Sequence, residues 1–294
     1  MATLAQNITK AINDFDNIKT AIQSKGVVVA SGTPTSDYDN LISNIPRDDS
    51  IFKGLVQRTA TSIIIPQGTT SIGSCVFYSF TLLESIIIPN SVTSIGNRAF
   101  ESCQALTNVT IPDSVTSMDS EAFRDCNNIS SLTIGSGLTT IPNYAFYNNM
   151  NGTGTLTIPD NITHIGTYAF SNWRKISTIN IGSGVIHIGD EAFSQAYNLT
   201  TLSIPSSITT IAGKNTFRDC SKLENVTIAN GFNANGLNLS WSTLYSVATI
   251  VSWLNALADR TGQTTYTLTI GTTNKNKLTA EQIAIATNKN WILV

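Results

Sequence analysis

Charged residues are scarce in this 294-residue chain, and long apolar runs are absent. Asp, Glu, Lys and Arg together make up 12% of the residues, and the formal net charge is -2. A surface with so little charge excludes a partner that is bound mainly by electrostatic attraction, such as nucleic acid. No run of about 18 apolar residues occurs, so we expect no membrane insertion. Because 41% of the residues are hydrophobic, the chain can bury a large core and leave Ser, Thr, Asn and Gly outside.

Motifs for metal, cofactor and catalytic sites are also lacking. The sequence has no C-x-x-C pair, no glycine-rich phosphate loop and no spacing that supports a Ser-His-Asp arrangement, so we expect no cofactor and no metal. The carboxylates are scattered, whereas a solenoid enzyme of the pectate-lyase type would need them clustered on one face. We therefore expect no catalytic residues and no enzymatic activity. The neighbours Arg124 and Asp125, like Arg218 and Asp219, are predicted to form local ion pairs.

The four cysteines do not indicate a disulfide framework. Cys103, Cys126 and Cys220 share one position of a repeat, which predicts small apolar groups that line the core. Cys103 and Cys126 would lie one coil apart, about 5 Å, so a bridge between them is an alternative to free thiols.

The two ends of the chain carry no recognisable targeting signal. Residues Met1 to Asn7 lack a basic region followed by an apolar one, and the last residues, Trp291 to Val294, do not form an anchor. We therefore expect synthesis without secretion, which weighs against an exported adhesin.

One motif is repeated eight times between residues 61 and 228. The third residue of this motif recurs every 23 or 24 positions, and so does a phenylalanine. The third residues are Ile65, Ile88, Ile111, Ile134, Ile158, Ile181, Ile204 and Ile228, and the phenylalanines are Phe77, Phe100, Phe123, Phe146, Phe170, Phe193 and Phe217. An apolar repeat with this period is the signature of a solenoid, in which stacked coils bury a shared core.

Each unit contains three groups of apolar residues. Leu106, Val109 and Ile111 show the L-x-x-L-x-L spacing of a short strand, which the following Pro112 ends. A second apolar pair, such as Val92 with Ile95, predicts a second strand, and Gly ends it in four units. An Ala-Phe pair follows, for which we expect a helical turn that places the ring in the core. The fold class is therefore a mainly β solenoid with small helical parts at its ends.

The pattern I-P-x-x-V-T-x-I-G-x-x-A-F-x-x-C-x-x-L-x-x-V resembles the BspA-like leucine-rich repeat family over about residues 61 to 230. The resemblance implies a curved solenoid of short strands, found in bacterial surface adhesins, protist surface proteins and phage proteins. It implies no catalytic site, because the matching positions are all structural. Two units depart from the pattern. The first has Thr69 and Val76 where Val and Ala are usual, and Gly152-Thr153-Gly154 interrupts the fourth, which lacks its leading Leu.

The N-terminal residues 1–46 form a separate module in this interpretation, joined to the solenoid (61–233) by a charged segment, 47–60. Residues 2 to 25 have an apolar stripe at helical spacing that needs a partner. The stripe residues proposed for assembly are Leu4, Ile8, Ile12, Phe15, Ile18 and Ile22. The pattern I-x-x-A-I-x-x-K-G-V-x-V-x-x-G-T-P-x-x-x-Y-x-x-x-I, from Ile18 to Ile42, resembles a module at the head of phage tail-fibre and baseplate proteins. A plain helical cap on the first repeat is the alternative.

Residues 234–294 are predicted to cap the other end of the solenoid. A helix is expected over Leu239 to Ala258, a strand over Thr265 to Gly271, a short helix that begins with a capping box at Thr279 and Gln282, and a final strand, Trp291 to Val294. This ending resembles the closing segment of such repeats in phage and gut-bacterial proteins.

Aromatic residues gather in the middle coils, where they could contact a ligand. Exposed rings can stack on sugars and peptides. Two histidines occupy one register on adjacent coils, for which a plain surface ladder is the alternative. The candidate ligand-binding residues are Tyr144, Tyr147, Tyr168, Trp173, Tyr197, His164 and His187. Rings that pack between neighbouring coils are the alternative for the aromatic residues.

These features together favour a non-catalytic phage tail, fibre or baseplate protein whose solenoid binds a glycan or protein of the host-cell surface. The N-terminal module would attach it to other virion proteins, in several copies. The expected location is the virion. A bacterial BspA-like adhesin or interaction protein, at the cell surface or in the cytoplasm, is the alternative.

Overall fold

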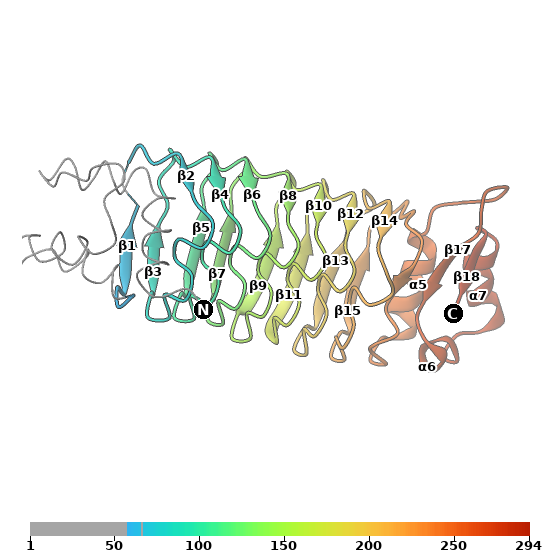
Figure 1. Ribbon diagram of the computed structural model, residues 1–294. Helices are drawn as coiled ribbons and strands as arrows, with labels where there is room; N and C mark the ends of the chain where they lie inside the picture. Colours follow the sequence, from blue (N-terminus) through green and yellow to red (C-terminus); the bar gives the residue numbers. More distant parts are fainter. Residues whose placement is uncertain (1–57, 66) are drawn as a thin grey trace, which may run out of the picture.

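The computed structural model describes residues 58–65 and 67–294. It shows a β solenoid, as the sequence predicted, in which successive coils stack along one axis toward a capped C-terminal end (Figure 1). The predicted N-terminal module, with its stripe from Leu4 to Ile22, lies outside the described residues, and so does most of the charged segment.

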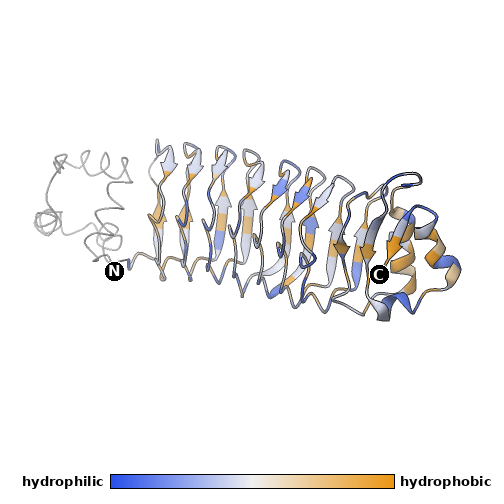
Figure 2. Cartoon of the chain, turned by 45° about the vertical axis from the view of Figure 1, so that its right-hand side comes forward, coloured by the Kyte–Doolittle hydropathy of each residue, from blue (hydrophilic) through white to orange (hydrophobic). Residues whose placement is uncertain are grey.

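The first side of the solenoid, which we call the long-strand side, consists of two parallel four-stranded sheets. Neighbouring strands pair in register, so that Val109 lies beside Leu132 and Ile179 beside Leu202. Its strands are β1 (Ser62–Ile64), β3 (Ser85–Ile87), β5 (Asn108–Ile111), β7 (Ser131–Ile134), β9 (Thr153–Ile158), β11 (Lys175–Ile181), β13 (Thr201–Ile204) and β15 (Asn225–Ile228). Apolar residues recur at the same place in successive coils (Figure 2). Along a strand such as β5 or β15, buried apolar residues alternate with exposed polar ones, as predicted.

The second side, the short-strand side, consists of two-residue strands that also pair in parallel. These are β2 (Ser71–Ile72), β4 (Ser94–Ile95), β6 (Ser117–Met118), β8 (Thr140–Ile141), β10 (His164–Ile165), β12 (His187–Ile188) and β14 (Thr210–Ile211). Their second residues point inward, and the polar first residues point outward.

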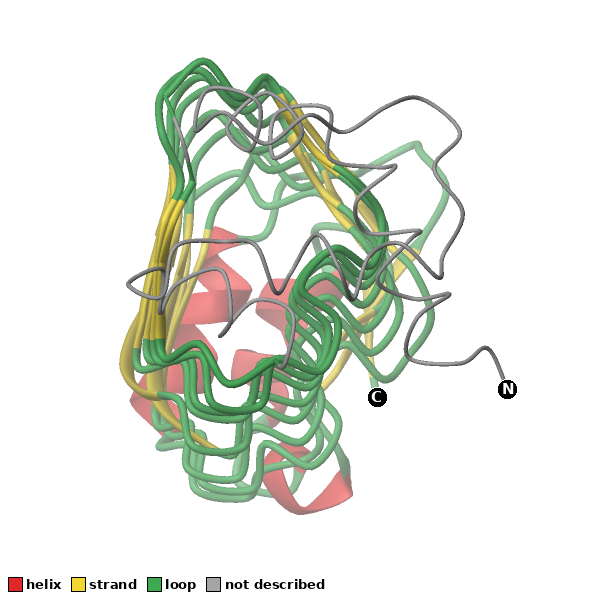
Figure 3. Cartoon of the chain, turned by 60° about the vertical axis from the view of Figure 1, so that its left-hand side comes forward, coloured by secondary structure: helices red, strands yellow, loops and turns green. Residues whose placement is uncertain are grey.

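The third side contains the Ala-Phe pairs, and here the expected helical turn is wrong. The segments are hydrogen-bonded turns, and we call this the turn side (Figure 3). The residue before Ala and the second residue after Phe have positive φ angles, such as 57° at Arg98 and 63° at Ser102. With these angles every second N–H points to the next coil, so that Phe100 N–H donates to the Ala122 carbonyl at 2.8 Å, whereas Ala99 N–H donates within its own coil to the Gly96 carbonyl at 3.2 Å. Bonds between coils therefore alternate with bonds inside the turn, in place of the continuous bonding of a helix.

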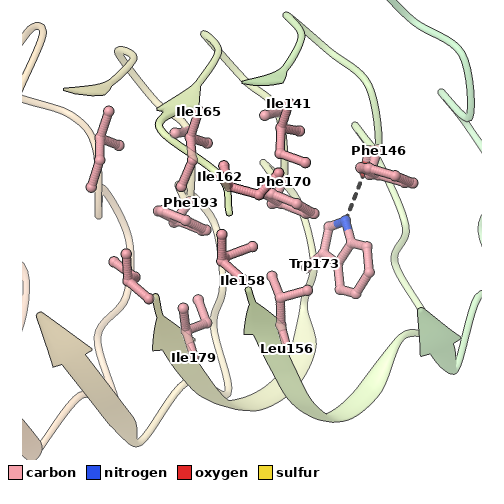
Figure 4. Packing of buried hydrophobic residues seen from close by; sticks show 14 of the residues in the cluster. Ile141, Phe146, Leu156, Ile158, Ile162, Ile165, Phe170, Trp173, Ile179 and Phe193 are labelled. Carbon is pink, nitrogen blue, oxygen red and sulfur yellow. Dashed lines mark hydrogen bonds between the residues drawn. The ribbon is translucent and has the colours of Figure 1, made fainter. Parts of the chain in front are cut away.

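The core is a continuous stack of the predicted phenylalanines. Each of the seven rings is at most 2% exposed. Phe123 lies between Phe100 and Phe146, with ring centroids 4.8 and 5.4 Å away. Buried isoleucines and leucines of the two strand sides surround this stack (Figure 4). Stacking of like residues in successive coils is what joins the repeats into one cooperative core.

The C-terminal cap has most of the predicted elements. A parallel sheet in the order β16 (Leu237–Asn238), β17 (Tyr266–Thr269) and β18 (Trp291–Leu293) is accompanied by α5 (Val247–Ala256), α6 (Thr272–Lys275) and α7 (Ala280–Thr287). The capping box of Thr279 and Gln282 is confirmed. Helix α5 begins later than predicted, because Ser246 caps it by accepting the N–H of Thr249. None of the described helices is long and apolar enough to cross a bilayer.

Candidate functional site

Ion pairs are unevenly distributed around the coil. Every ion pair that the structure records among the described residues lies on the turn side, whereas Ser, Thr and Asn dominate the outward positions of the strand sides. The predicted pairs Arg124–Asp125 and Arg218–Asp219 are confirmed, at 3.3 and 3.6 Å. Closer partners come from other register positions, because Glu121 lies 2.7 Å from Arg124. The turn side is therefore the charged face of a nearly neutral surface.

Three of the predicted ligand-binding tyrosines meet on this side, and we call Tyr144, Tyr147 and Tyr168 the tyrosine patch. The rings of Tyr144 and Tyr168 stack with centroids 5.0 Å apart. Tyr147 is edge-on to both, at 5.7 and 6.2 Å. All three side chains are half-buried. Such a cluster of rigid rings offers contact area at low entropic cost.

The repeat itself brings these rings together. Tyr144 and Tyr168 each precede an Ala-Phe pair and have the same φ of 56°. Their backbones are hydrogen-bonded to the next coil, Tyr144 N–H to the Thr167 carbonyl and Tyr168 N–H to that of Asp190, both at 3.0 Å. Equal backbone geometry in adjacent coils aligns equal side chains, so the rings stack along the solenoid axis.

Charged groups border the tyrosine patch at both ends. The Arg124 guanidinium lies over the Tyr147 ring, 5.6 Å from its centroid. At the other end, the Tyr168 hydroxyl donates to Glu191 Oε1 at 2.9 Å. Arg218 lies 3.0 Å from the second oxygen of Glu191. The site thus combines aromatic rings, a guanidinium and a largely buried carboxylate.

This environment changes the acidity of two groups. The hydrogen bond to Glu191, aided by burial, raises the pKa of Tyr168 to about 12. Burial raises the pKa of the Glu101 carboxyl, which Arg98 and Arg124 only partly offset. Tyr168 is therefore a neutral hydrogen-bond donor at any physiological pH.

Trp173 is not part of this surface, which corrects the sequence-based expectation that it is an exposed anchor. It is only 4% exposed, and its indole N–H donates to the Phe146 carbonyl at 2.7 Å (Figure 4). The ring fills the place of the leading Leu that the fourth unit lacks. A Cβ added to Gly152 would lie 3.2 Å from the Trp173 ring and 2.8 Å from the Ile129 carbonyl oxygen. For Trp173 the alternative interpretation, a ring that packs between neighbouring coils, is therefore confirmed.

The remaining candidates lie away from the tyrosine patch. His164 and His187 are paired neighbours on the short-strand side, as their register predicted, with ring centroids 5.8 Å apart. Burial and the neighbouring His164 lower the pKa of His187. Tyr197 is 38% exposed, and Arg174 lies over its ring at 5.8 Å. No recorded interaction among the described residues joins these side chains to the patch.

The cysteines are free thiols, and no bridge joins Cys103 to Cys126. Their Sγ atoms donate to the carbonyls of Phe77 and Phe100, each at 3.1 Å. Burial, with the adjacent Cys103 contributing, raises the pKa of the Cys126 thiol. Within the described part of the chain, no group of three or more His, Cys, Asp or Glu side chains could bind a metal ion.

Sequence reasoning missed Glu191 as a member of the site. Its signal was present, because Glu191 occupies the same position before an Ala-Phe pair as Tyr144 and Tyr168. Aligning the coils by register would have placed it next to Tyr168.

Comparison with known proteins agrees with this architecture. The model of the BspA type leucine-rich repeat region matches six copies, over residues 48–153 and 152–247. The chain belongs to the BspA-type leucine-rich repeat family. Proteins with this type of solenoid are typically non-catalytic scaffolds that mediate interactions, and BspA-type proteins are often found on bacterial surfaces. No curated protein matches the chain at a significant level.

Solved structures of other leucine-rich repeat proteins are similar to this BspA-type chain. A leucine-rich repeat protein of T. pallidum is 22% identical, with a TM-score of 0.51 over 56% of this chain and 78% of that one. A Bacteroides ovatus leucine-rich repeat protein is 24% identical, with a TM-score of 0.47 over 57% and 49% of the two chains. A leucine-rich cell surface protein of Faecalibacterium prausnitzii is also 24% identical, with a TM-score of 0.40 over 70% and 65%.

Proposed function

We propose that this protein is a non-catalytic binding protein that contacts a ligand on a cell surface through the tyrosine patch. The observation that carries the proposal is the cluster of Tyr144, Tyr147 and Tyr168 between Arg124 and Glu191 on the charged side of the coil. Tyr and Arg are the residue types that most often dominate the energy of interfaces. The strand sides offer hydroxyl and amide ladders, which supply regular hydrogen bonds but no comparable anchor.

A protein fits this patch better than a glycan does. Sugars stack on free ring faces, but Tyr144 and Tyr168 each cover one face of the other, and Arg124 lies over Tyr147. What remains for a ligand is a set of ring edges, hydroxyl groups and single ring faces. Such a surface suits the side chains and backbone of a protein partner, with the polar rim that interfaces have.

In the finer form of this proposal, the protein is a phage tail, fibre or baseplate component. Residues 1–46, whose sequence resembles a tail-fibre module, would attach it to the virion, and the solenoid would bind the host cell. Several copies on one particle would raise the affinity beyond that of a single patch. A surface adhesin of a bacterium is the second candidate, favoured by the cell-surface members of the family. Immunogold labelling of purified virions and of intact cells separates the two.

Replacing Tyr144 and Tyr147 together by Ala tests the proposed contact. Fluorescently labelled protein is titrated against a panel of candidate bacterial cells, and binding is measured by flow cytometry. We expect the double variant to bind at least about 30-fold more weakly, which corresponds to about 2 kcal/mol for a binding hot spot. Its circular dichroism spectrum should match that of the parent.

The matched control is Tyr78→Ala. Tyr78 occupies the same position after a Phe as Tyr147, but in the first coil, and it is 38% exposed. The Tyr78→Ala variant should bind cells as strongly as the parent protein does. Equal binding by the double variant and the parent would place the contact elsewhere on the molecule.

A further inference from the structure

The two strand sides of the solenoid are each interrupted once. On the long-strand side, the sheet β1-β3-β5-β7 is separate from the sheet that contains β9, β11, β13 and β15. On the short-strand side, β2-β4-β6 is separate from the sheet that contains β8, β10, β12 and β14. Both interruptions divide the chain between β7 and β8. We call this the central break, with an N-terminal half (58–134) and a C-terminal half (140–294).

A proline explains the interruption on the short-strand side. In other coils, the residue after the short strand donates its N–H to the preceding coil, as Asp119 does to Ile95 and Gly166 to Ile141, at 2.9 and 2.8 Å. Pro142 occupies this position after β8. Because proline has no N–H, the bond to the Met118 carbonyl cannot form.

An irregular unit explains the interruption on the long-strand side. Ile134 and Ile158 are 24 positions apart, one more than Ile111 and Ile134. The unit also has Gly152 in place of its leading Leu, and Gly154 has a φ of 81°. The extra residue alone does not interrupt pairing, because β13 and β15 contain residues that are also 24 positions apart and pair in register. What distinguishes this unit is its pair of glycines, and no recorded backbone hydrogen bond joins β7 to β9. The sequence had indicated that Gly152-Thr153-Gly154 interrupts the repeat pattern of this unit.

The turn side, by contrast, continues across the central break without a gap. Glu121, Phe123 and Asp125 donate their N–H groups to the carbonyls of Asn143, Ala145 and Tyr147, at 3.1, 2.8 and 2.9 Å. The bond from Asn151 N–H to the Asn127 carbonyl follows at 2.9 Å. Backbone bonding that is continuous on one side and interrupted on two is the geometry of a hinge, with the turn side as its axis.

The tyrosine patch lies next to this axis, and its neighbours span it. Arg124 belongs to the N-terminal half and lies over Tyr147 of the C-terminal half. Asp125 accepts the side-chain N–H of Asn148 across the same line, at 2.6 Å. A partner that touches both Arg124 and Tyr147 therefore contacts both halves at once.

We propose that the solenoid bends at the central break about the turn side, and that a partner on the tyrosine patch selects one bend angle. A ligand that contacts both halves has different affinities for different angles, and so shifts their populations. The bending itself does not depend on the proposed function. The selection of an angle rests on it.

Spin-label distances test the bending. Labels are placed on exposed long-strand positions, Thr110→Cys and Thr157→Cys, which flank the central break two coils apart. The control pair, Asn180→Cys with Thr227→Cys, lies two coils apart within the C-terminal half. Both pairs are made in a Cys75→Ser background, because the other cysteines are buried. We expect a clearly broader distance distribution for the pair across the break, and equal widths would overturn the proposal.

Restoring the missing donor provides a second measurement. In Pro142→Ala the residue matches Ala212, which donates to the Ile188 carbonyl at 2.8 Å in an uninterrupted coil. The distance distribution across the break should narrow, and amide exchange of Thr140 and Ile141 should slow at least several-fold. A distribution that stays broad while exchange slows, or exchange that does not slow, would contradict the role given to Pro142.

Cell binding of cross-linked protein tests the coupling to the tyrosine patch. A short bismaleimide that joins Cys residues at positions 110 and 157 fixes the bend angle, and we expect cell binding to change several-fold. Joining positions 180 and 227 should leave it unchanged. Unchanged binding of the first cross-linked protein would overturn the coupling. Absence of binding by the uncross-linked parent would instead overturn the proposed function and leave the bending to the distance measurements.

Discussion

At the scale of single residues, the phenylalanine stack carries much of the stability. Phe123 is fully buried between the rings of Phe100 and Phe146. We expect Phe123→Ala to lower the free energy of unfolding by about 3 to 5 kcal/mol, because it leaves a cavity that a stacked neighbour cannot fill. Denaturant titration measures the change. A loss below about 1 kcal/mol would mean that the coils can collapse around the missing ring.

Alkaline titration of Tyr168 reports directly on the geometry of the patch. The hydrogen bond to Glu191 favours the neutral phenol and raises the pKa to about 12, above the ordinary value of 10.0. Its stabilisation is therefore fully present below pH 10 and is lost as the pH rises toward about 12. The absorbance difference between the parent and Tyr168→Phe isolates this group. The titration midpoint of Tyr168 should be lower in the Glu191→Gln variant than in the parent. A midpoint near 10 in the parent would contradict the hydrogen bond.

Trp173 shows where residue-level reasoning from sequence fails. Its repeat position pointed to the core, because Cys103, Cys126 and Cys220 stand there in other coils. Its type and its tyrosine neighbours suggested an exposed anchor instead. The deciding factor was the space above Gly152, in an adjacent coil. The pattern of one repeat unit does not show that a large residue in one coil fills the space left by a small residue in the next.

At the scale of elements, one lysine links the last helices of the cap. Lys289 Nζ donates to the carbonyls of Leu254, Asn255 and Leu257 at the C-terminal end of α5, at 3.2, 2.6 and 2.9 Å. We expect Lys289→Met to cost about 2 to 3 kcal/mol, because unpaired carbonyls remain at a helix end that also favours positive charge. Urea titration measures the loss.

Lys222→Met is the control for that substitution. Lys222 donates to the exposed Asn198 side chain at 2.6 Å and has no role at a helix end. Its removal should cost well under 1 kcal/mol, as exposed polar contacts do. An equal loss in both variants would mean that the charge of Lys289, rather than its three bonds, matters.

The turn side shows the limit of pattern reading for elements. The Ala-Phe pairs were predicted to lie on helical turns that place the ring in the core. The structure instead places isolated positive φ angles along these turns, with non-glycine residues such as Arg98 and Glu121 in the left-handed region. Hydrogen bonds to two neighbouring coils supply the energy for this conformation. Only stacking provides those bonds.

At the scale of the whole molecule, the role of residues 1–46 stays a prediction. Their apolar stripe is larger than a lone surface helix leaves exposed, so we expect it to bind another subunit or virion protein. Deleting residues 1–46 should leave a folded, monomeric solenoid that no longer assembles. Circular dichroism and light scattering measure the two properties. A deletion variant that unfolds would show that these residues cap the solenoid rather than connect it.

The sequence by itself determined the coil. Local spacing predicts the period, the strands, the buried Ile and Phe columns, the capping box and the irregular fourth unit. Because the same spacing occurs in successive units, each unit supports the prediction made from the others. The tertiary structure decided whatever depends on how one coil meets the next. It buried Trp173 over Gly152, brought Glu191 to Tyr168, and interrupted both strand sides at Pro142 and Gly154 while the turn side stayed continuous. These outcomes depend on pairs of residues about 23 positions apart, and only stacking makes them neighbours.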